Sequence, residues 1–357
     1  MLQAAYQFQL NGTPKSCARY GSGHINETYL LETGDRRYIL QKINRRVFRD
    51  VPALMKNVAL VTRHLSRLEP DPRRVLSLVS TVDGIDYWTD AQGEYWRVYD
   101  YITDGVCLDQ AESALDMFQT GMAFGRFQSM LSSFPAETLC ETIVRFHDTP
   151  NRYAQLREAM EKNPLGRLHT AEAEVAFALE REKEAGGMVR MREEGLLPLR
   201  VTHNDTKLNN VMLDLKTGTP LCVVDLDTVM PGLAGNDFGD SIRFGASTAQ
   251  EDETNLDKVS LSLEYYRAYA QGFLDACGGN LVRQEIDTLP LGAKLMTLEC
   301  GIRFLTDYLS GDTYFRIHRP GHNLDRCRTQ FKLVADMESK WDAMGEIIQT
   351  VARRHNA

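Results

Sequence analysis

Hydrophobic and polar positions follow different patterns in the two parts of this chain. The first hundred residues alternate short apolar runs with polar breaks, whereas later stretches repeat apolar residues at helical spacing. Residues 27–33 and 36–43 combine β-branched and aromatic residues on either side of Gly34-Asp35, which predicts an antiparallel hairpin. More strands are predicted at 75–82, 85–88 and 95–101.

A helix is predicted over residues 51–65, between the hairpin and the later strands. Its apolar residues recur every three or four positions, and Asp50 precedes it as a capping residue. We therefore expect this helix to bury one face against the sheet.

Long helices are predicted after residue 105. This change predicts two lobes, with the crossover near residues 101–105. The smaller lobe, residues 1–103, is β-rich, and the larger lobe, residues 104–357, is α-helical. The fold class is therefore α+β. The helical stretches are 111–131, 152–161, 171–194, 256–274, 291–309 and 324–354.

Composition excludes several classes of protein. With 49 acidic and 41 basic residues the formal net charge is −8, and no Lys/Arg-rich run indicates nucleic acid or an anionic membrane. The seven cysteines are scattered and form no Cys-x-x-Cys pair, which favours reduced thiols. No signal segment or long apolar span is recognised, so a cytoplasmic location is expected.

The richest chemistry lies between residues 202 and 227. His203, Asp205 and Asn210 have the spacing His-x-Asp-x-x-x-x-Asn, and an apolar strand ending at Asp225 follows. Phosphoryl transfer needs one carboxylate for the acceptor hydroxyl and oxygen ligands for Mg²⁺ on the nucleotide phosphates. We therefore assign Asp205 as the catalytic carboxylate and Asn210 and Asp225 as metal ligands, in a two-lobed protein-kinase-like fold that uses ATP and Mg²⁺.

Neighbouring residues have less specific roles. Lys207 fits a cation that stabilises the transferring phosphoryl group, whereas His203 is expected to pack and hold the loop. Asp227 either shares the metal or braces the loop. Asp240 is expected to hold backbone amides of the catalytic loop, with a capping role as the alternative.

Gly21, Ser22 and Gly23 precede the first hairpin strand and are predicted to cover the nucleotide phosphates, because glycines let backbone amides approach closely. A plain turn is the alternative, since Asn26 stands where the third glycine of a kinase loop is expected. His24 lies at the tip of this loop, from which it would reach the acceptor.

Gln41 occupies the strand position where a kinase carries its phosphate-binding lysine, so we assign it to the nucleotide. The helix over residues 51–65 has no glutamate for the usual ion pair and carries Asn57 instead. We hypothesise that a neutral Gln41–Asn57 contact replaces that pair. The alternative is that Lys42, which should point to the opposite face, takes over through a one-residue shift.

His147-Asp148 precedes Thr149-Pro150 and has no asparagine at the catalytic offset. We therefore interpret it as a turn between helices.

These segments resemble the aminoglycoside phosphotransferase and choline kinase superfamily, and within it the N-acetylhexosamine 1-kinase family. The resemblance extends along the whole chain. It is carried by residues 20–26, 38–41, 201–210, 225–228, 238–247, 299–309 and 314–315.

The resemblance implies ATP- and Mg²⁺-dependent phosphorylation of the anomeric hydroxyl of N-acetylglucosamine or N-acetylgalactosamine. It also implies that His24, Arg303 and Tyr314 contact the sugar. For Arg303 the alternative is an i, i+4 ladder with Glu299 and Asp307. For Tyr314 the alternative is core packing. A kinase for choline, an aminoglycoside or homoserine is the main rival, a nucleotide-binding scaffold without catalysis is the second, and the epimer preference and oligomeric state stay open.

Overall fold

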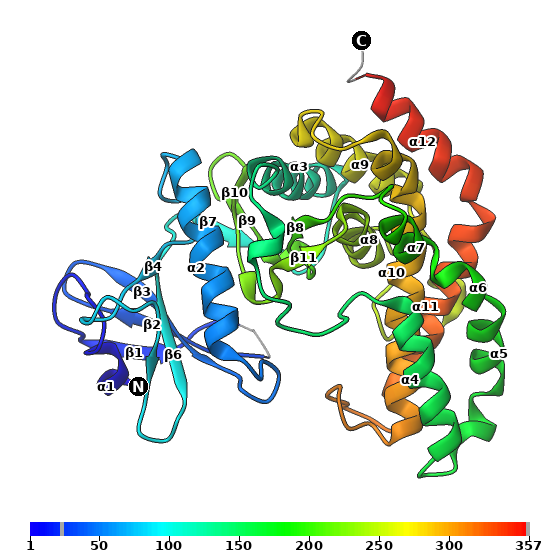
Figure 1. The fold of residues 1–357 in the computed structure, drawn as a ribbon, viewed down its shortest axis with the longest axis horizontal. Coiled ribbons are helices and arrows are strands. Elements are labelled where there is room, and N and C mark those ends of the chain that lie inside the picture. The colour runs from blue at the N-terminus through cyan, green and yellow to red at the C-terminus, as the bar shows by residue number, and fades with distance from the viewer. Residues whose placement is uncertain (22–24, 355–357) are drawn as a thin grey trace. The chain divides into compact units, whose positions relative to one another are not determined.

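The computed structural model describes residues 1–21 and 25–354, and the chain divides into two compact units (Figure 1). A β-sheet region at the N-terminus and a helical C-terminal region confirm the α+β class. Each unit combines segments that are separate in the sequence. Unit 1 comprises Met1–Cys107, Ser133–Val144 and Val211–Pro231; unit 2 comprises Leu108–Ser132, Arg145–Asn210 and Gly232–Ala357.

Unit 1 is built on a six-stranded sheet with the order β1-β2-β3-β6-β4, in which β5 also pairs with β6. The hairpin predicted around Gly34-Asp35 is confirmed, because β2 and β3 pair antiparallel. The predicted strands at 75–82 and 85–88 shrink to two residues each. The bounds are β1 Ser16–Arg19, β2 Glu27–Glu32, β3 Arg37–Ile43, β4 Leu78–Val79, β5 Trp88–Thr89 and β6 Tyr95–Asp100.

The two faces of this sheet carry different side chains. Tyr38, Leu40 and Val98 lie on one face, in a core that the short helix α1 (Leu2–Ala5) also joins. Gln41 pairs with Arg97 across β3 and β6 in the register. Because successive strand residues point to opposite faces, Arg97 and Gln41 lie on the face opposite to this core.

Helix α2 (Val51–Leu68) begins at Asp50, whose carboxylate accepts the Ala53 amide at 2.9 Å. The predicted cap is therefore confirmed. Val51, Leu54 and Val58 are almost fully buried, as their helical spacing indicates.

A second sheet of unit 1 has the order β10-β9-β7 and ends just before the candidate metal ligand Asp225. Its strands are β7 Gly105–Cys107, β9 Val211–Asp214 and β10 Pro220–Val223. The 3₁₀ helix η4 (Leu226–Thr228) follows β10.

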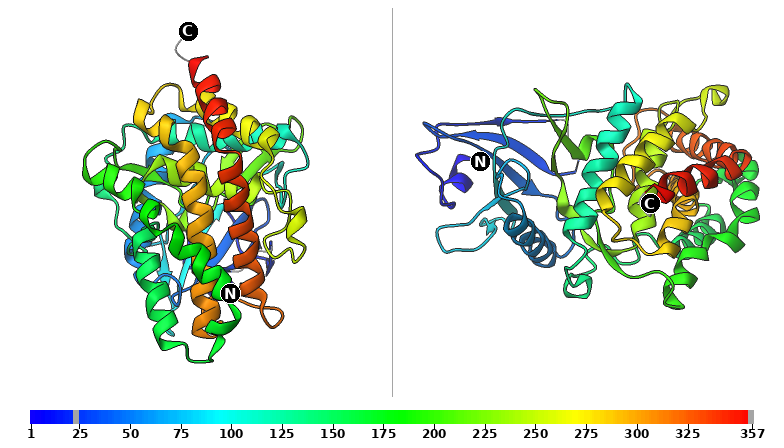
Figure 2. Two further views of the ribbon diagram at one scale, coloured as in Figure 1. Left: turned by 90° about the vertical axis from the view of Figure 1, so that its right-hand side faces the viewer. Right: turned by 90° about the horizontal axis from the view of Figure 1, so that it is seen from above.

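Unit 2 is mainly helical, and its longest helix, α10, packs against α4, α8 and α11 (Figures 1 and 2). The helices are α3 Ala114–Met130, α4 Thr149–Lys162, α5 Glu172–Glu180, α6 Glu182–Ala185, α7 Gly187–Glu193, α8 Ala234–Gly245, α9 Leu263–Cys277, α10 Arg283–Ser310, α11 His322–Ser339 and α12 Trp341–Arg353. The short strand β8 (Arg200–Thr202) leads into the catalytic loop, and β11 (Met230–Gly232) precedes α8.

Two of the predicted helices are broken. The stretch 171–194 forms α5, α6 and α7, and Gly186-Gly187 supplies the weak helical propensity at the second break. The stretch 324–354 divides at Lys340, whose ammonium instead donates to the Leu261 carbonyl and the Asp336 carboxylate.

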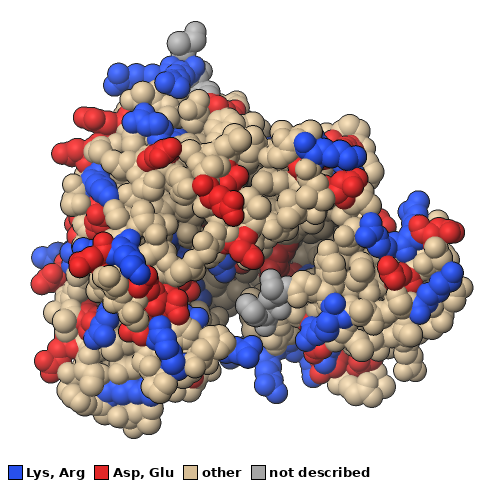
Figure 3. Space-filling view, turned by 180° about the vertical axis from the view of Figure 1, so that it is seen from behind, with Lys and Arg blue, Asp and Glu red and all other residues tan. Residues whose placement is uncertain are grey.

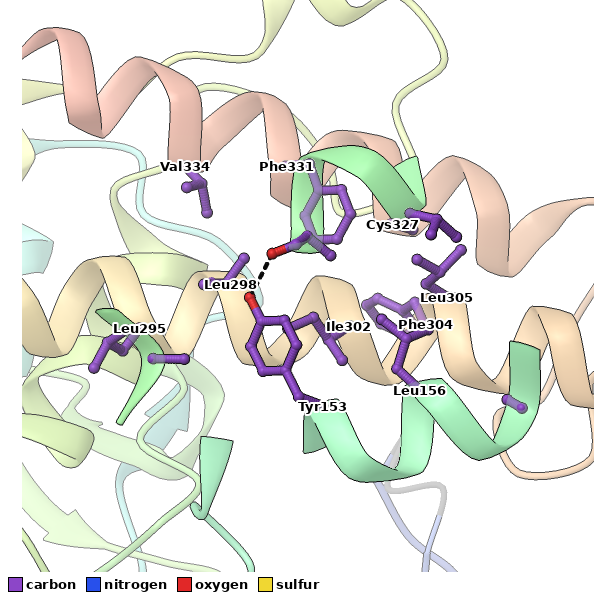
Figure 4. Packing of buried hydrophobic residues seen from close by; sticks show 14 of the residues in the cluster. Tyr153, Leu156, Leu295, Leu298, Ile302, Phe304, Leu305, Cys327, Phe331 and Val334 are labelled. Carbon is purple, nitrogen blue, oxygen red and sulfur yellow. Dashed lines mark hydrogen bonds between the residues drawn. The ribbon is translucent and has the colours of Figure 1, made fainter. Parts of the chain in front are cut away.

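The core of unit 2 forms where α4, α10 and α11 meet, as Figure 4 shows. Tyr153 and Leu156 of α4 face Leu298 and Ile302 of α10, and Phe331 of α11 closes the cluster. The one polar atom that Tyr153 brings into the core is satisfied, because its hydroxyl donates to the Ala178 carbonyl at 2.7 Å. This packing makes α10 a firm base for side chains on its other faces.

Lys/Arg and Asp/Glu side chains are interspersed over the face shown in Figure 3. Within residues 1–21 and 25–354, no helix has the length and apolar character needed to cross a membrane.

Glycines allow α3 and α9 to approach each other closely. A Cβ at Gly272 of α9 would overlap the Phe118 carbonyl oxygen of α3, and a Cβ at Gly121 would overlap the Tyr269 carbonyl oxygen. The contact is therefore made backbone to backbone, which leaves no room for a larger residue.

We predict that Gly272→Ala lowers the free energy of unfolding by about 1–3 kcal/mol, because the added methyl group overpacks this contact. Gly345→Ala in α12 is the matched control, since its Cβ would meet nothing within 4 Å. That control should gain about 0.5–1 kcal/mol from helix propensity. Urea denaturation of both variants tests the difference, and equal stabilities would contradict it.

Candidate active site

The residues that the sequence assigned to catalysis are distributed over both units. Ser22, Gly23 and His24 lie outside the described residues. Unit 1 holds Gly21, Gln41 and Asp225, and unit 2 holds Asp205, Lys207, Asn210, Arg303 and Tyr314.

The backbone of the catalytic loop is held by two buried carboxylates of α8. Asp237 accepts the amides of His203 and Asn204, each at 2.8 Å. Asp240 accepts the Thr206 amide at 3.0 Å, so the bracing role expected for it is confirmed. The backbone amides on both sides of Asp205 are therefore hydrogen-bonded to α8. These bonds fix the backbone from which the Asp205 side chain projects.

Asp205, Lys207 and Asn210 form one cluster at the end of this loop. The Lys207 ammonium lies 2.9 Å from Asp205 Oδ1, and Asn210 Nδ2 donates to Asp205 Oδ2 at 3.1 Å and to its carbonyl at 2.8 Å. Burial favours the neutral acid, but Lys207 holds the pKa of Asp205 below its ordinary value. Asp205 is thus an oriented, ionised carboxylate at neutral pH.

Asn210 is suited to hold a hard cation. Both of its side-chain hydrogen bonds use the amide nitrogen, and among the described residues no donor is bonded to its Oδ1. That oxygen is the type of ligand that Mg²⁺ prefers, and it adds no negative charge.

His203 has the structural role expected of it. Its ring is fully buried and packs edge-on against Phe124 and Phe127, with centroids 5.5 and 5.9 Å away. The next residue, Asn204, has a φ of +64°, which is strained for a residue with a side chain. Such strain immediately before Asp205 indicates that the loop conformation is maintained for a purpose.

In unit 1 the candidate metal ligand Asp225 also has a left-handed backbone, with φ +58°. Next to it, Asp227 makes a fully buried ion pair with Arg97 of β6, at 2.5 Å between Nη1 and Oδ1. Asn26, at the end of the glycine segment, donates to the other Asp227 oxygen at 2.5 Å. Asp227 therefore braces the segment that follows Asp225 by bonding Arg97 and Asn26. Bracing is one of the two roles expected for Asp227.

The hypothesised Gln41–Asn57 contact is wrong. Gln41 Oε1 accepts two bonds from the Arg97 guanidinium, at 3.0 Å from Nε and 2.8 Å from Nη2. Asn57 instead bonds backbone groups, with Nδ2 donating to the Cys140 and Val229 carbonyls at 2.7 and 3.0 Å. Sequence analysis missed Arg97. Its contact with Gln41 arises from the pairing of β6 with β3, which the spacing of residues along the chain does not indicate.

Lys42 lies on the opposite side of the sheet from Gln41, as the strand alternation predicts. Its ammonium is 3.5 Å from Glu27 and 3.8 Å from Glu94. The buried cation on the Gln41 side of the sheet is therefore Arg97.

Tyr99 lies beside this network and offers an unused donor. Its hydroxyl is buried and has no hydrogen-bond partner among the described residues. Burial, together with the negative charges of Asp227 and Asp225, raises its pKa. An unsatisfied hydroxyl near these carboxylates fits a site that takes a polar ligand or a hydrated cation.

Arg303 does not form the i, i+4 ladder that was the alternative to sugar binding. Both Glu299 oxygens bond other residues, and Asp307 bonds backbone amides. Within the described residues Arg303 makes no hydrogen bond or ion pair, and its guanidinium lies over the rings of Phe146 and Phe315 at 5.5 and 5.4 Å. Its donors are therefore available to a ligand.

Tyr314 stands on a loop that Asp307 fixes to α10. Asp307 accepts the amides of Thr313, Tyr314 and Phe315 at 2.8–2.9 Å. The Tyr314 side chain is 66% exposed, so core packing, the alternative to sugar contact, is excluded for it.

His147 is a second site residue, after Arg97, that the sequence analysis missed. Asp148 caps α4, as a turn residue does, by accepting the Asn151 amide at 2.9 Å. His147 instead reaches the catalytic loop, with Nε2 3.2 Å from the Asn204 carbonyl and Nδ1 3.1 Å from Glu299. No local spacing indicates these contacts, because Glu299 is 152 positions away.

The family model for the phosphotransferase enzyme family (APH) matches residues 16–273, which is more than half of the chain. The chain belongs to this family. The matched range includes both acidic segments described above.

Solved structures of this phosphotransferase family's fold are similar over nearly the whole chain. A microcompartment-associated aminopropanol kinase has a TM-score of 0.66 and 18% identity, with 96% of this chain and 97% of that chain covered. An aminoglycoside phosphotransferase from Alicyclobacillus acidocaldarius has a TM-score of 0.61 and 13% identity, with 99% and 96% covered. A spectinomycin phosphotransferase in complex with ADP and spectinomycin has a TM-score of 0.55 and 12% identity, with 97% and 94% covered. At these identities the likeness shows the kinase-like fold alone.

For this phosphotransferase family member we predict that Gln41→Lys lowers the free energy of unfolding by about 1–3 kcal/mol. The substitution removes an acceptor from Arg97 and puts a second cation beside it. Thermal and urea denaturation measure the effect.

Lys42→Gln is the matched control, because it changes the neighbouring residue on the other face. It removes two surface ion pairs and should cost no more than about 1 kcal/mol. An equal loss of unfolding free energy in both variants would contradict the prediction, because the Arg97–Gln41 contact would then not account for the effect of Gln41→Lys.

Proposed function

We propose that this protein is an ATP-dependent kinase that phosphorylates the anomeric (C1) hydroxyl of N-acetylhexosamines, giving the sugar 1-phosphate and ADP. The family and the Asp205–Lys207–Asn210 cluster support phosphoryl transfer to a hydroxyl. The type of acceptor is supported by one observation above the others: within the described residues the Arg303 guanidinium makes no hydrogen bond or ion pair and lies over the rings of Phe146 and Phe315.

A second guanidinium, that of Arg152, lies near Arg303. The pKa of Arg152 is lowered, first by burial and then by the neighbouring Arg303 guanidinium, so the two cations are close. Its Nε is also buried without a hydrogen-bond partner. An amine acceptor such as choline or an aminoglycoside would meet like charge here, whereas hydroxyl and acetamido oxygens of a sugar would accept these donors.

In the proposed reaction Asp205 takes or orients the proton of the attacking hydroxyl. An anomeric hydroxyl is more acidic than an ordinary alcohol, so an ionised carboxylate with a lowered pKa is a sufficient base. Lys207, 2.9 Å from Asp205, supplies positive charge to the transferring phosphoryl group.

Asn210 and Asp225 are the residues that would hold Mg²⁺, and both offer oxygen ligands. The ion would supply charge neutralisation for the nucleotide phosphates. ATP use is further supported by the ADP bound to the spectinomycin phosphotransferase of the same fold. Gly21, Ser22 and Gly23 are proposed to cover these phosphates, with His24, Arg303 and Tyr314 contacting the sugar.

The acceptor is tested by a panel of hexoses, N-acetylhexosamines, choline and aminoglycosides with Mg-ATP. We expect ADP formation with N-acetylglucosamine or N-acetylgalactosamine, and a phosphorus NMR signal coupled to the anomeric proton. Turnover of an amine acceptor instead would leave the family assignment intact but reject the sugar 1-kinase proposal.

We predict that Asp205→Asn reduces turnover by about 10²–10⁴-fold, because the amide cannot accept the hydroxyl proton. ADP affinity, measured by calorimetry, should stay near that of the wild type. Asp257→Asn, an exposed aspartate of unit 2, is the control and should keep full turnover. Retained turnover in Asp205→Asn would rule out its catalytic role.

A further inference from the structure

Three separate segments of unit 2 meet at the His147 side chain. It lies before α4, its Nδ1 is 3.1 Å from Glu299 Oε1 on α10, and its Nε2 is 3.2 Å from the Asn204 carbonyl in the catalytic loop. The side chain of His147 is only 10% exposed, and that of Glu299 only 2%. Both side chains of this contact are therefore largely shielded from solvent.

The two partners determine the protonation state of His147. A carbonyl oxygen only accepts hydrogen bonds, and so does an ionised carboxylate, so each ring nitrogen must carry a proton. Burial raises the pKa of Glu299, but the His147 hydrogen bond and the guanidinium charges of Arg152 and Arg303 bring it below its ordinary value, and Thr149 donates to Oε2 at 2.9 Å. Because both arginines act independently of His147, Glu299 is the ionised partner. His147 is therefore an imidazolium.

Charged groups around His147 act in both directions. Burial lowers the pKa of His147, but Glu299 and Asp240 of α8 raise it above its ordinary value, against the opposing effect of Arg303. Arg152 of α4 lies on the far side, 3.9 Å from Glu299. The cation is favoured in the folded state, so its contribution to stability is complete below pH 6.5 and is lost as the pH rises through the raised pKa.

His147 completes the support of the strained residue before Asp205. The amide of Asn204 is bonded to Asp237, and its carbonyl is bonded to the imidazolium. Both peptide groups of a residue with φ +64° are thus held, which orients the following carboxylate.

His147 also determines the state of Arg303. Glu299 stands one turn before Arg303 on α10, at the spacing where a carboxylate and a guanidinium pair. Glu299 is instead hydrogen-bonded to His147 at one carboxylate oxygen and to Thr149 at the other, which orients it toward α4. The Arg303 guanidinium lies over Phe146 and Phe315 and makes no hydrogen bond within the described residues.

We propose that His147 is a positioning residue of the candidate active site: its imidazolium ties the Asn204 carbonyl to Glu299 and thereby leaves Arg303 to the acceptor. This inference rests on the proposed function, because it takes Asp205 as the catalytic carboxylate and Arg303 as an acceptor contact. His147 itself touches neither the sugar nor the nucleotide in this role.

His147→Gln tests the proposal by steady-state kinetics between pH 6 and 10. A neutral side chain frees Glu299 to pair with Arg303 and loosens the loop, so kcat/KM for the acceptor should fall by about 100-fold with a raised acceptor KM. The KM for ATP should change little. The wild type should lose activity on the alkaline side as His147 deprotonates, and the variant should lack that limb.

Two further variants separate positioning from a merely structural role. The double variant His147→Gln, Glu299→Gln removes the competing carboxylate, so the acceptor KM should return toward the wild-type value. Lys294→Met breaks another buried ion pair of α10, with Glu338 at 3.0 Å, and should lower the melting temperature without moving the pH profile. A wild-type acceptor KM and an unchanged alkaline limb in His147→Gln would overturn the proposal.

NMR of the imidazole nitrogens tests the cation without any substrate. The wild type should show His147 with both nitrogens protonated at pH 7, identified as the signal that His147→Gln lacks. A neutral ring would overturn the proposal whatever the acceptor is. Absence of hexosamine turnover together with a doubly protonated His147 would contradict the proposed function instead, and the kinetic comparison would then use the acceptor that is turned over.

Discussion

The candidate active site depends on buried carboxylates that bind backbone amides of the catalytic loop. Asp237 holds residues 203 and 204, and Asp240 holds residue 206, so α8 determines where Asp205 stands. Buried carboxylates are costly unless donors satisfy them, and here the donors are the loop itself. The loop and the helix therefore stabilise each other, and these bonds hold Asn204 in the left-handed conformation that Asn tolerates better than most residues.

In unit 1, too, buried charged groups are satisfied by partners from other segments of the chain. Arg97 links β6 to the segment after Asp225 through Asp227, while Gln41 accepts from the same guanidinium. A protein kinase joins a lysine and a glutamate at this strand and helix. Here the buried cation comes from the neighbouring strand, and Asn57 of α2 bonds the backbone instead.

Local patterns predicted the parts of this structure that local chemistry determines. The β2–β3 hairpin, the Asp50 cap and the cluster of Asp205 with Asn210 all depend on residues close in the sequence. The contacts that escaped prediction join distant positions. Arg97 and Asp227 are 130 positions apart, so no periodicity or spacing relates them. The sequence predicts only a turn at His147, because its partners lie far away in the sequence, on α10 and in the catalytic loop.

In the proposed reaction the phosphoryl group goes to an anomeric hydroxyl of a neutral sugar whose oxygens accept hydrogen bonds from Arg303. The most direct test measures ADP formation from Mg-ATP with N-acetylglucosamine or N-acetylgalactosamine and, in parallel, with the corresponding methyl glycoside, which lacks a free C1 hydroxyl. We expect ADP release with at least one free sugar and none above background with its methyl glycoside. Equal turnover of a sugar and its methyl glycoside would contradict it, because the phosphate would then be going to another hydroxyl.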